Sequence, residues 1–264
     1  MGKLLLHRSH GLPPHVAPRW LRIWLPPQYA SDHERRFPVV YLHDGQNLFD
    51  DAEAFGGASW RLGETATRLL ARRKIAPCIL VGIDNAGAHR LDDYTPVPMY
   101  GRGGHADDYA RLLLTQIKPF VDHRYRTRPD AVHTAIVGAS LGGLCALHLA
   151  LRHPDVFGHA AALSPTLAWG HGWLLRTLAR LPARVPVRIW IDAGKREPPE
   201  LRQQLREIRD LLEARGWRVH RVARRADLRC PEITGGRHDE RSWSKRMHRV
   251  LQFLLPPEPR PRRR

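Results

Sequence analysis

One serine lies where a strand-like run of residues changes into a run with helical spacing. The segment GASLGG places Ser140 between the apolar run 134–140 and the helix-like run 141–153. On such a sharp turn the residues two before and two after the serine must be small, and Gly138 and Gly142 meet that need. The N-terminal N–H groups of the helix would face an oxyanion formed at Ser140. This pattern predicts a serine nucleophile for acyl transfer.

A serine hydroxyl needs a neighbouring base before it can attack a carbonyl group. His238 lies in GGRHDERSW, after the last expected strand and just before the C-terminal helix, where Gly235 and Gly236 let a loop reach back over the sheet edge. The chain order of serine, acid and histidine agrees with this position. His220 and His248 are the alternatives, but both lie on periodic segments that direct them elsewhere. We therefore predict that His238 is the base.

A carboxylate should orient the imidazole, and two candidates follow the expected strand 187–194. Asp192 lies within the end of this strand, and Glu197 lies in the turn GKREPPE beyond it. A catalytic carboxylate must reach the imidazole from a loop past the carboxyl edge of the sheet, which favours Glu197 over Asp192. Asp227 and Asp239 remain open as further alternatives.

Two backbone N–H groups would have to stabilise the oxyanion of the tetrahedral intermediate. One belongs to Leu141, the residue after the nucleophile, and the other to the loop YLHDGQNLFD. Gly45 permits unusual backbone angles in that loop, so the N–H of Gly45 or Gln46 is the expected second donor. His43 and Asp44 precede the serine and are interpreted as structural residues.

The elements that must position these residues alternate between short apolar strands and amphipathic helices. Strands are expected at 19–26, 37–45, 77–84, 134–140, 159–165, 187–194 and 217–222. Helices are expected at 60–73, 107–120, 141–153, 199–215 and 242–255. This order predicts an α/β fold with a mostly parallel sheet, helices on both faces and an antiparallel opening. Because no repeat or linker divides the chain, we expect one domain over residues 1–255.

The C-terminal helix shows how such a helix would pack on the sheet. Its apolar residues recur at steps of three and four and form one stripe: Trp243, Met247, Val250, Leu251 and Leu254. The opposite face would carry Lys245, Arg246 and Arg249, which we expect to be solvated.

The formal net charge of +17 raises the question of a polyanionic partner. The arginines are spread over every expected helix instead of gathering on one face with aromatic residues between them. We therefore expect no nucleic-acid partner beyond nonspecific charge attraction, although a noncatalytic polyanion-binding protein remains an alternative. The tail PPEPRPRRR, residues 256–264, is expected to be a disordered basic extension.

The cysteines and the apolar runs indicate the cellular compartment of the protein and argue against a metal site and a membrane span. Cys78, Cys145 and Cys230 are widely spaced and odd in number, which is typical of a reducing compartment. Neither they nor the sixteen histidines show metal-ligand spacing, so no metal site is expected. No run approaches the roughly 18 apolar residues of a membrane span, and the N-terminus lacks a secretory signal pattern. We expect a cytoplasmic protein without membrane contact.

Taken in order, these motifs resemble the putative esterase family of α/β-hydrolases, which includes feruloyl and related carbohydrate esterases, siderophore esterases and S-formylglutathione hydrolase. Besides GASLGG, the resemblance covers VVYLHDGQNLFD, PCILVGIDNAGAHRLDDYTPV, FGHAAALSPTLAW and GGRHDERSWSKR, nearly the whole chain. It implies an α/β-hydrolase fold with Ser140 as nucleophile, His238 as base and a carboxylate after the seventh strand, which Glu197 matches best. It also implies a small-molecule ester substrate and no cofactor.

Five residues fall on segments expected near the mouth of the site and are candidate substrate contacts: Trp60, Arg90, Asp92, Tyr94 and Tyr100. Arg90 would suit an anionic substrate. The loop YGRGGHADD lacks the lysine of a phosphate-binding loop and is interpreted as a flexible lid. A peptidase or acyltransferase with the same three residues is a further alternative, and no feature indicates the oligomeric state or the ester hydrolysed.

Overall fold

The computed structural model describes residues 2–9, 18–219 and 226–258. Within these residues its centre is a nine-stranded sheet in the order β1-β2-β4-β3-β7-β8-β9-β10, with β11 also paired to β9. The strands are β1 (Lys3–Arg8), β2 (Trp20–Leu25), β3 (Val39–His43), β4 (Ile79–Ile83), β7 (Thr134–Ala139), β8 (His159–Leu163), β9 (Arg188–Gly194), β10 (Leu228–Arg229) and β11 (Glu232–Ile233).

The sheet opens with antiparallel strands and continues with parallel ones. β1 pairs antiparallel with β2, and β2 pairs antiparallel with β4. All other pairs of this sheet are parallel. Because parallel strands end at the same edge, the carboxyl ends of β3, β7, β8 and β9 lie together. The predicted mixed, mostly parallel sheet is therefore confirmed.

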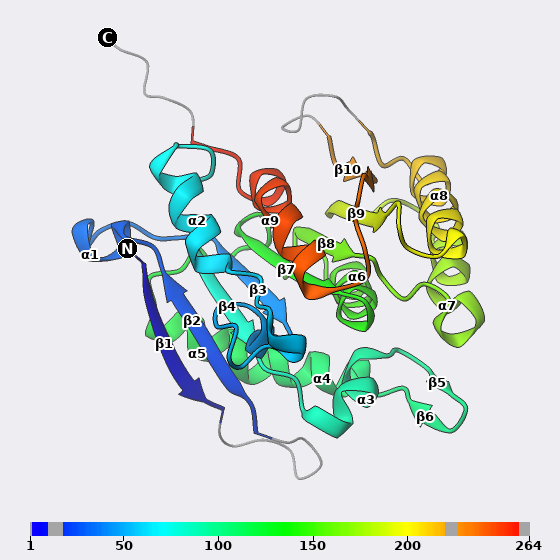
Figure 1. The fold of residues 1–264 in the computed structure, drawn as a ribbon, viewed down its shortest axis with the longest axis horizontal. Coiled ribbons are helices and arrows are strands. Elements are labelled where there is room, and N and C mark those ends of the chain that lie inside the picture. Colours follow the sequence, from blue (N-terminus) through cyan, green and yellow to red (C-terminus); the bar gives the residue numbers. More distant parts are fainter. Residues whose placement is uncertain (1, 10–17, 220–225, 259–264) are drawn as a thin grey trace.

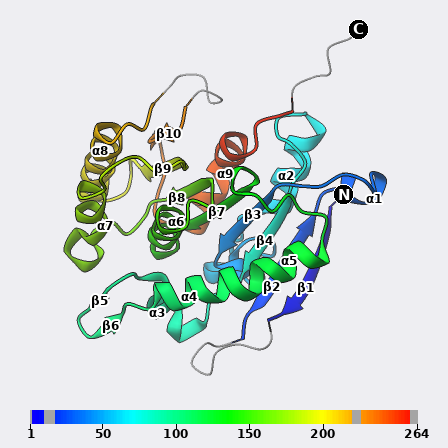
Figure 2. The same cartoon turned by 180° about the vertical axis from the view of Figure 1, so that it is seen from behind.

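Helices cover both faces of the sheet. In Figure 1, α2 (Leu62–Ala71) and α9 (Glu240–Leu254) lie in front of it. The opposite face, seen in Figure 2, is covered by α4 (Ala106–Leu112), a π-helical turn (Leu113–Ile117), α5 (Lys118–Arg124), α6 (Leu141–Arg152), α7 (Trp169–Ala179) and α8 (Pro199–Ala214). Smaller elements are α1 (Gln28–Ser31), α3 (Arg90–Tyr94) and the hairpin of β5 (Pro98–Met99) and β6 (Arg102–Gly103).

Alternation along the buried strands creates two hydrophobic cores. In β3, Val39 and Tyr41 pack into the core that contains α6, whereas Val40 and Leu42 pack into the core that contains α2 and α9. Successive side chains of a strand point to opposite faces, so a strand covered on both faces must be apolar throughout. This explains why β3, β4 and β7 are continuous buried runs.

The predicted helices are confirmed to within a few residues at their starts. The exception at a C-terminal end is the helix predicted over 107–120, which is interrupted by the π-helical turn and continues to Arg124. The sequence did not predict β1, α3 and α7, nor the short elements α1, β5, β6, β10 and β11.

Part of the predicted strand 217–222 lies outside the described residues. In its described part only Val219 forms an isolated bridge, to Leu228. The neighbours of β9 on this side are instead β10 and β11.

The C-terminal extension predicted over 256–264 is described only as far as residue 258, and residues 256–258 form neither helix nor strand. The single domain over 1–255 stays a prediction. Among the described residues, none of the helices has the length and apolar character that crossing a bilayer demands.

Candidate active site

Ser140 occupies a strained turn between β7 and α6. Its backbone angles, φ 55° and ψ −122°, are unfavourable for a residue with a side chain. The chain folds back so closely that a Cβ atom on Gly138 would lie 2.2 Å from the carbonyl oxygen of Gly142. The small residues around the serine are therefore required by backbone contact. The turn leaves the Ser140 side chain at the carboxyl edge of the sheet, on the wall of a cavity of about 880 Å³.

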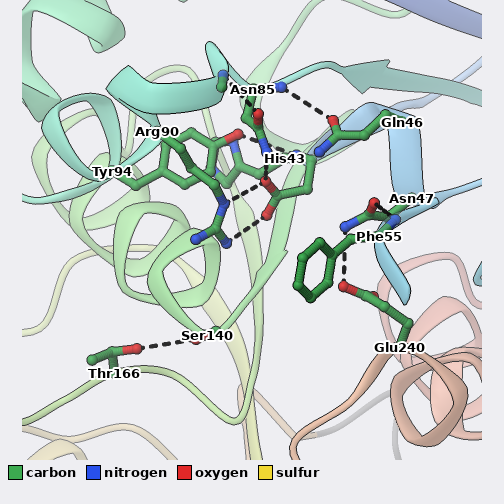
Figure 3. Close-up of polar contacts among 12 residues, drawn as sticks. His43, Gln46, Asn47, Phe55, Asn85, Arg90, Tyr94, Ser140, Thr166 and Glu240 are labelled. Atoms are coloured by element: carbon green, nitrogen blue, oxygen red, sulfur yellow. Dashed lines mark hydrogen bonds and ion pairs between the residues drawn. The ribbon is translucent and has the colours of Figure 1, made fainter. Parts of the chain in front are cut away.

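A continuous hydrogen-bonded row joins Ser140, His238 and Glu197. The Nε2 atom of His238 lies 3.0 Å from Oγ of Ser140, and its Nδ1 atom lies 3.3 Å from Oε2 of Glu197. With its proton on Nδ1, the imidazole donates to the carboxylate and accepts from the serine hydroxyl. Thr166 Oγ1 also lies 3.3 Å from Ser140 Oγ, as Figure 3 shows. These atoms have the relative positions that nucleophilic catalysis needs.

The loop that carries His238 is held against the end of β9 by backbone contact. The N–H of Arg196 donates to the carbonyl oxygen of Gly236 at 3.0 Å. A Cβ atom on Gly194 would lie 2.3 Å from backbone atoms of Gly236, so these two segments of the chain approach as closely as glycines allow. This contact brings His238 beside Glu197, although 41 residues separate them in the sequence.

The side chain of Glu197 is fully buried and charged. Burial alone would raise its pKa, but hydrogen bonds with His238, Ser164 and the Gly194 N–H outweigh that effect and leave the pKa below its ordinary value. Ser164 Oγ donates to Oε1 of Glu197 at 2.6 Å, and Gly194 N donates to the same oxygen at 2.9 Å. Glu197 therefore presents its other oxygen, Oε2, to the imidazole.

Asp192, the alternative acid, lies behind Glu197 instead of beside His238. It is fully buried, and its carboxylate contacts Arg246 at 3.1 Å and the Trp190 indole N–H at 2.9 Å. Burial raises its pKa to about 6. Arg246, expected on the solvated face of its helix, is instead 2% exposed. The expectation was wrong because the helix turns this residue toward the buried carboxylates at the end of β9.

The remaining acid and base candidates have other partners. Asp227 forms ion pairs with Arg184 and Arg218, and Asp239 caps α9 by accepting from Ser242 N at 2.7 Å. His248 donates from Nδ1 to the backbone of its own helix. His220 lies outside the described residues.

The expected oxyanion donors lie at two neighbouring segments of the sheet edge. Leu141 is the first residue of α6, so its N–H lies at the positive end of that helix. Gly45 begins the short helical turn Gly45–Asn47 after β3 and packs so tightly that a Cβ atom would lie 2.6 Å from Asp84. Gln46 lines the cavity with Ser140, and its Oε1 accepts from Asn85 N at 3.2 Å (Figure 3).

His43 and Asp44 have contacts that agree with their interpretation as structural residues. Asp44 forms two hydrogen bonds with the Arg90 guanidinium, at 2.6 and 2.8 Å, and accepts from Asn85 at 2.7 Å. His43 is buried and lies 3.0 Å from the Tyr109 hydroxyl. Burial lowers the pKa of His43 to about 3, so it is neutral.

Only two of the five candidate substrate contacts line the cavity. Trp60 and Arg90 do so. Tyr94 is fully buried and its hydroxyl accepts from Asp44 N, while Asp92 accepts from the Gly103 N–H. Tyr100, 85% exposed, lies between the strands of the β5–β6 hairpin. The structure therefore places these three side chains outside the lining of the cavity, and their role as substrate contacts stays a prediction.

The comparisons with known proteins agree with this arrangement. The model of the family described as "Putative esterase" matches residues 17–254. The chain belongs to this esterase family. YbbA from Bacillus subtilis is 25% identical over 250 residues, which cover 89% of this chain and 92% of YbbA. The ferri-bacillibactin esterase BesA from the same organism is 26% identical over 203 residues, which cover 67% of this chain and 66% of BesA.

The solved structures agree on the fold. The BES protein from Bacillus cereus superposes with a TM-score of 0.74 at 18% identity, covering 96% of this chain and 94% of that protein. This likeness confirms the predicted α/β-hydrolase fold. By its family, the protein is a carboxylic ester hydrolase.

Several residues of the esterase site had no sequence signal. Glu240 lines the cavity, where Oε1 accepts from Asn47 Nδ2 at 3.0 Å and Oε2 accepts from the Trp60 indole N–H. Burial raises the pKa of Glu240 to about 7. Phe55 is 80% exposed on the same wall, and Figure 3 shows it beside Glu240. In the described part of the chain no cluster of side chains has the composition of a metal site.

Proposed function

We propose that this esterase hydrolyses a small-molecule carboxylic ester through an acyl-enzyme on Ser140, with His238 as base and Glu197 as the orienting acid. The observation that carries the proposal is the hydrogen-bonded row from Glu197 through His238 to Ser140. This row opens on a cavity of about 880 Å³, which lies within the size range of small-molecule sites.

The reaction proceeds in two halves. In the first, Ser140 Oγ bonds to the carbonyl carbon, its proton passes to Nε2 of His238, and an electron pair moves to the carbonyl oxygen. When the bond to the alcohol breaks, Nε2 returns the proton to the leaving oxygen. In the second half a water attacks the acyl group in the same way, and Ser140 leaves with its proton restored.

Glu197 and backbone N–H groups act on the charges that form during these steps. The Glu197 carboxylate holds the Nδ1 proton and stabilises the imidazolium that forms when Nε2 is protonated. The oxyanion would be stabilised by the N–H of Leu141 and by that of Gln46 or Gly45. Leu141 has an added advantage because it begins α6, whose N-terminus carries partial positive charge.

The side chains that line the cavity indicate what kind of substrate it could hold. Arg90 is already paired with Asp44, so it offers only part of its charge to an anionic substrate. Phe55, Trp60 and Glu240 provide an aromatic and hydrogen-bonding wall. BesA is named for a ferri-bacillibactin ester, so siderophore esters are one class to test beside feruloyl, acetyl-sugar and thiol esters.

The proposal is tested by Ser140→Ala, assayed with p-nitrophenyl acetate. We expect kcat/KM to fall about 10⁴-fold or more, because only binding and oxyanion contacts would remain. A fluorophosphonate probe should label the native protein and not the variant. Ser9→Ala is the matched control, since Ser9 is a buried serine whose Oγ accepts from Arg19 N in another part of the molecule. Turnover by Ser140→Ala at the native rate would contradict the mechanism.

A further inference from the structure

Behind Glu197, on the side away from His238, lies a buried polar network that the hydrolytic steps do not use. Its members are Ser164 at the end of β8, Asp192 in β9 and Arg246 in α9, each no more than 2% exposed. We propose that Ser164, Arg246 and Asp192 are positioning residues that fix Glu197 in the orientation needed by His238. This inference rests on the proposed function, because it assigns a task to residues that contact the acid of that mechanism.

Ser164 has a hydrogen-bond pattern that admits one orientation of its hydroxyl. Its Oγ lies 2.6 Å from Arg246 Nη2 and 3.2 Å from Trp243 Nε1, and both of these groups can only donate. The hydroxyl proton must therefore go to the third neighbour, Oε1 of Glu197, at 2.6 Å. One donor and two acceptor positions are all used, so neither the hydroxyl nor the carboxylate can rotate without losing a buried hydrogen bond.

The backbone of Ser164 is held at the same place by Asp192. Ser164 has a left-handed φ of 46°, which a residue with a side chain adopts only where its surroundings impose it. Its N–H donates to the Asp192 carbonyl oxygen at 2.9 Å and approaches the Asp192 carboxylate at 3.3 Å. The strained turn thus carries the Ser164 hydroxyl to Glu197.

Arg246 lies between two carboxylates and pairs more closely with Asp192 than with Glu197. Its Nη2 atom is 3.1 Å from Asp192 Oδ1 and 3.8 Å from Glu197 Oε1. If Asp192 did not neutralise this guanidinium, Arg246 would be drawn to Glu197 and would compete with His238 for the carboxylate. Asp192 is therefore assigned as the counter-ion of Arg246, which leaves Oε2 of Glu197 free for the imidazole.

The decisive experiment is a double-mutant cycle of Ser164→Ala and Glu197→Ala, measured with p-nitrophenyl acetate. Ser164→Ala alone should lower kcat about 10- to 100-fold and leave KM within about twofold, because a misoriented acid affects the chemical step more than substrate binding. In the Glu197→Ala background the same change should alter kcat less than about twofold, since its target is gone. Equal losses in both backgrounds would overturn the inference.

Ser164→Gly separates the hydroxyl from the backbone turn. Glycine adopts a left-handed φ without strain, so this variant should fold even if Ser164→Ala does not. We expect the same loss of kcat as for alanine, whereas native kcat in Ser164→Gly would show that the hydroxyl is not needed. Ser9→Ala, the loss of another buried serine, should leave kcat unchanged.

The failure of this inference is distinguishable from that of the proposed function. If Ser140→Ala keeps native turnover, the mechanism itself is contradicted. If Ser140→Ala is inactive and the losses from Ser164 and Glu197 multiply, only the positioning role is contradicted.

Discussion

At the scale of single residues, Glu240 makes stability depend on pH. Its pKa is raised from 4.5 to about 7, mainly because burial disfavours the carboxylate. Of the charged groups around it, Asp44 and Asp239 also raise the pKa, whereas Arg90 lowers it. Between pH 4.5 and 7 the folded protein holds a proton there that the unfolded chain has lost, so this group contributes less stability as pH rises. We expect the free energy of unfolding of the native protein to fall, relative to Glu240→Gln, between pH 5 and pH 8.

Urea unfolding of both proteins at the two pH values measures this difference. Other titrating groups, Asp192 among them, are common to both proteins and cancel in the comparison. A difference between the two proteins that is the same at both pH values would show that Glu240 titrates normally.

The residues of the site differ in how far the sequence could predict them. Ser140 and His238 lie in local patterns whose glycines are visible in the chain. The roles of Ser164 and Arg246 depend on contacts between residues far apart in the sequence. Ser164 contacts Glu197 across 33 residues and Arg246 contacts Ser164 across 82, and no local pattern indicates these contacts. The helical spacing of Arg246 is that of a solvated residue. Helical periodicity does not show whether a buried carboxylate lies at the end of a neighbouring strand, so the burial of Arg246 could not be predicted.

At the scale of elements, the crossing of β7 and α6 should tolerate substitution very unevenly. A Cβ atom on Gly138 would meet backbone atoms of Gly142 at 2.2 Å, so Gly138→Ala must displace the helix and should cost about 3 kcal/mol of stability together with most of the activity. For Gly142→Ala the nearest atoms are at 3.2 Å, in His43 and Asp44, and the expected cost is about 1 kcal/mol. Urea unfolding and kcat measure both effects. Equal costs for the two variants would contradict the crowded crossing.

The elements that the sequence failed to predict have physical reasons in the structure. β1 is an edge strand whose side chains are exposed or half-buried, so its apolar residues did not stand out as a core strand. α7 begins at Trp169, and its next three residues, Gly170, His171 and Gly172, have left-handed conformations, so its regular part is short. The strands β3, β4 and β7 were predictable because burial on both faces forces an apolar run.

At the scale of the whole molecule, the net charge of +17 and the esterase site are separate properties. Part of the positive charge is internal, since Arg19, Arg22 and Arg246 are buried and paired with carboxylates. The cavity itself is lined by the acidic residues Asp44, Glu53, Asp239 and Glu240 and by the arginines Arg90 and Arg241. An electrostatic attraction for polyanions should therefore act on the outer surface, away from Ser140.

This separation predicts how DNA affinity and ester turnover respond to removing residues 259–264, which contain four arginines. The shortened chain should bind DNA more weakly, with the slope of log affinity against log salt reduced by up to about 3.6, because each phosphate contact contributes roughly 0.9. Its kcat/KM for p-nitrophenyl acetate should equal that of the full chain, with or without DNA. Fluorescence anisotropy across salt concentrations measures the first quantity and an esterase assay the second. If DNA affinity survives the deletion and DNA competes with the ester, the charge belongs to the site, and the polyanion-binding alternative is favoured over a pure esterase.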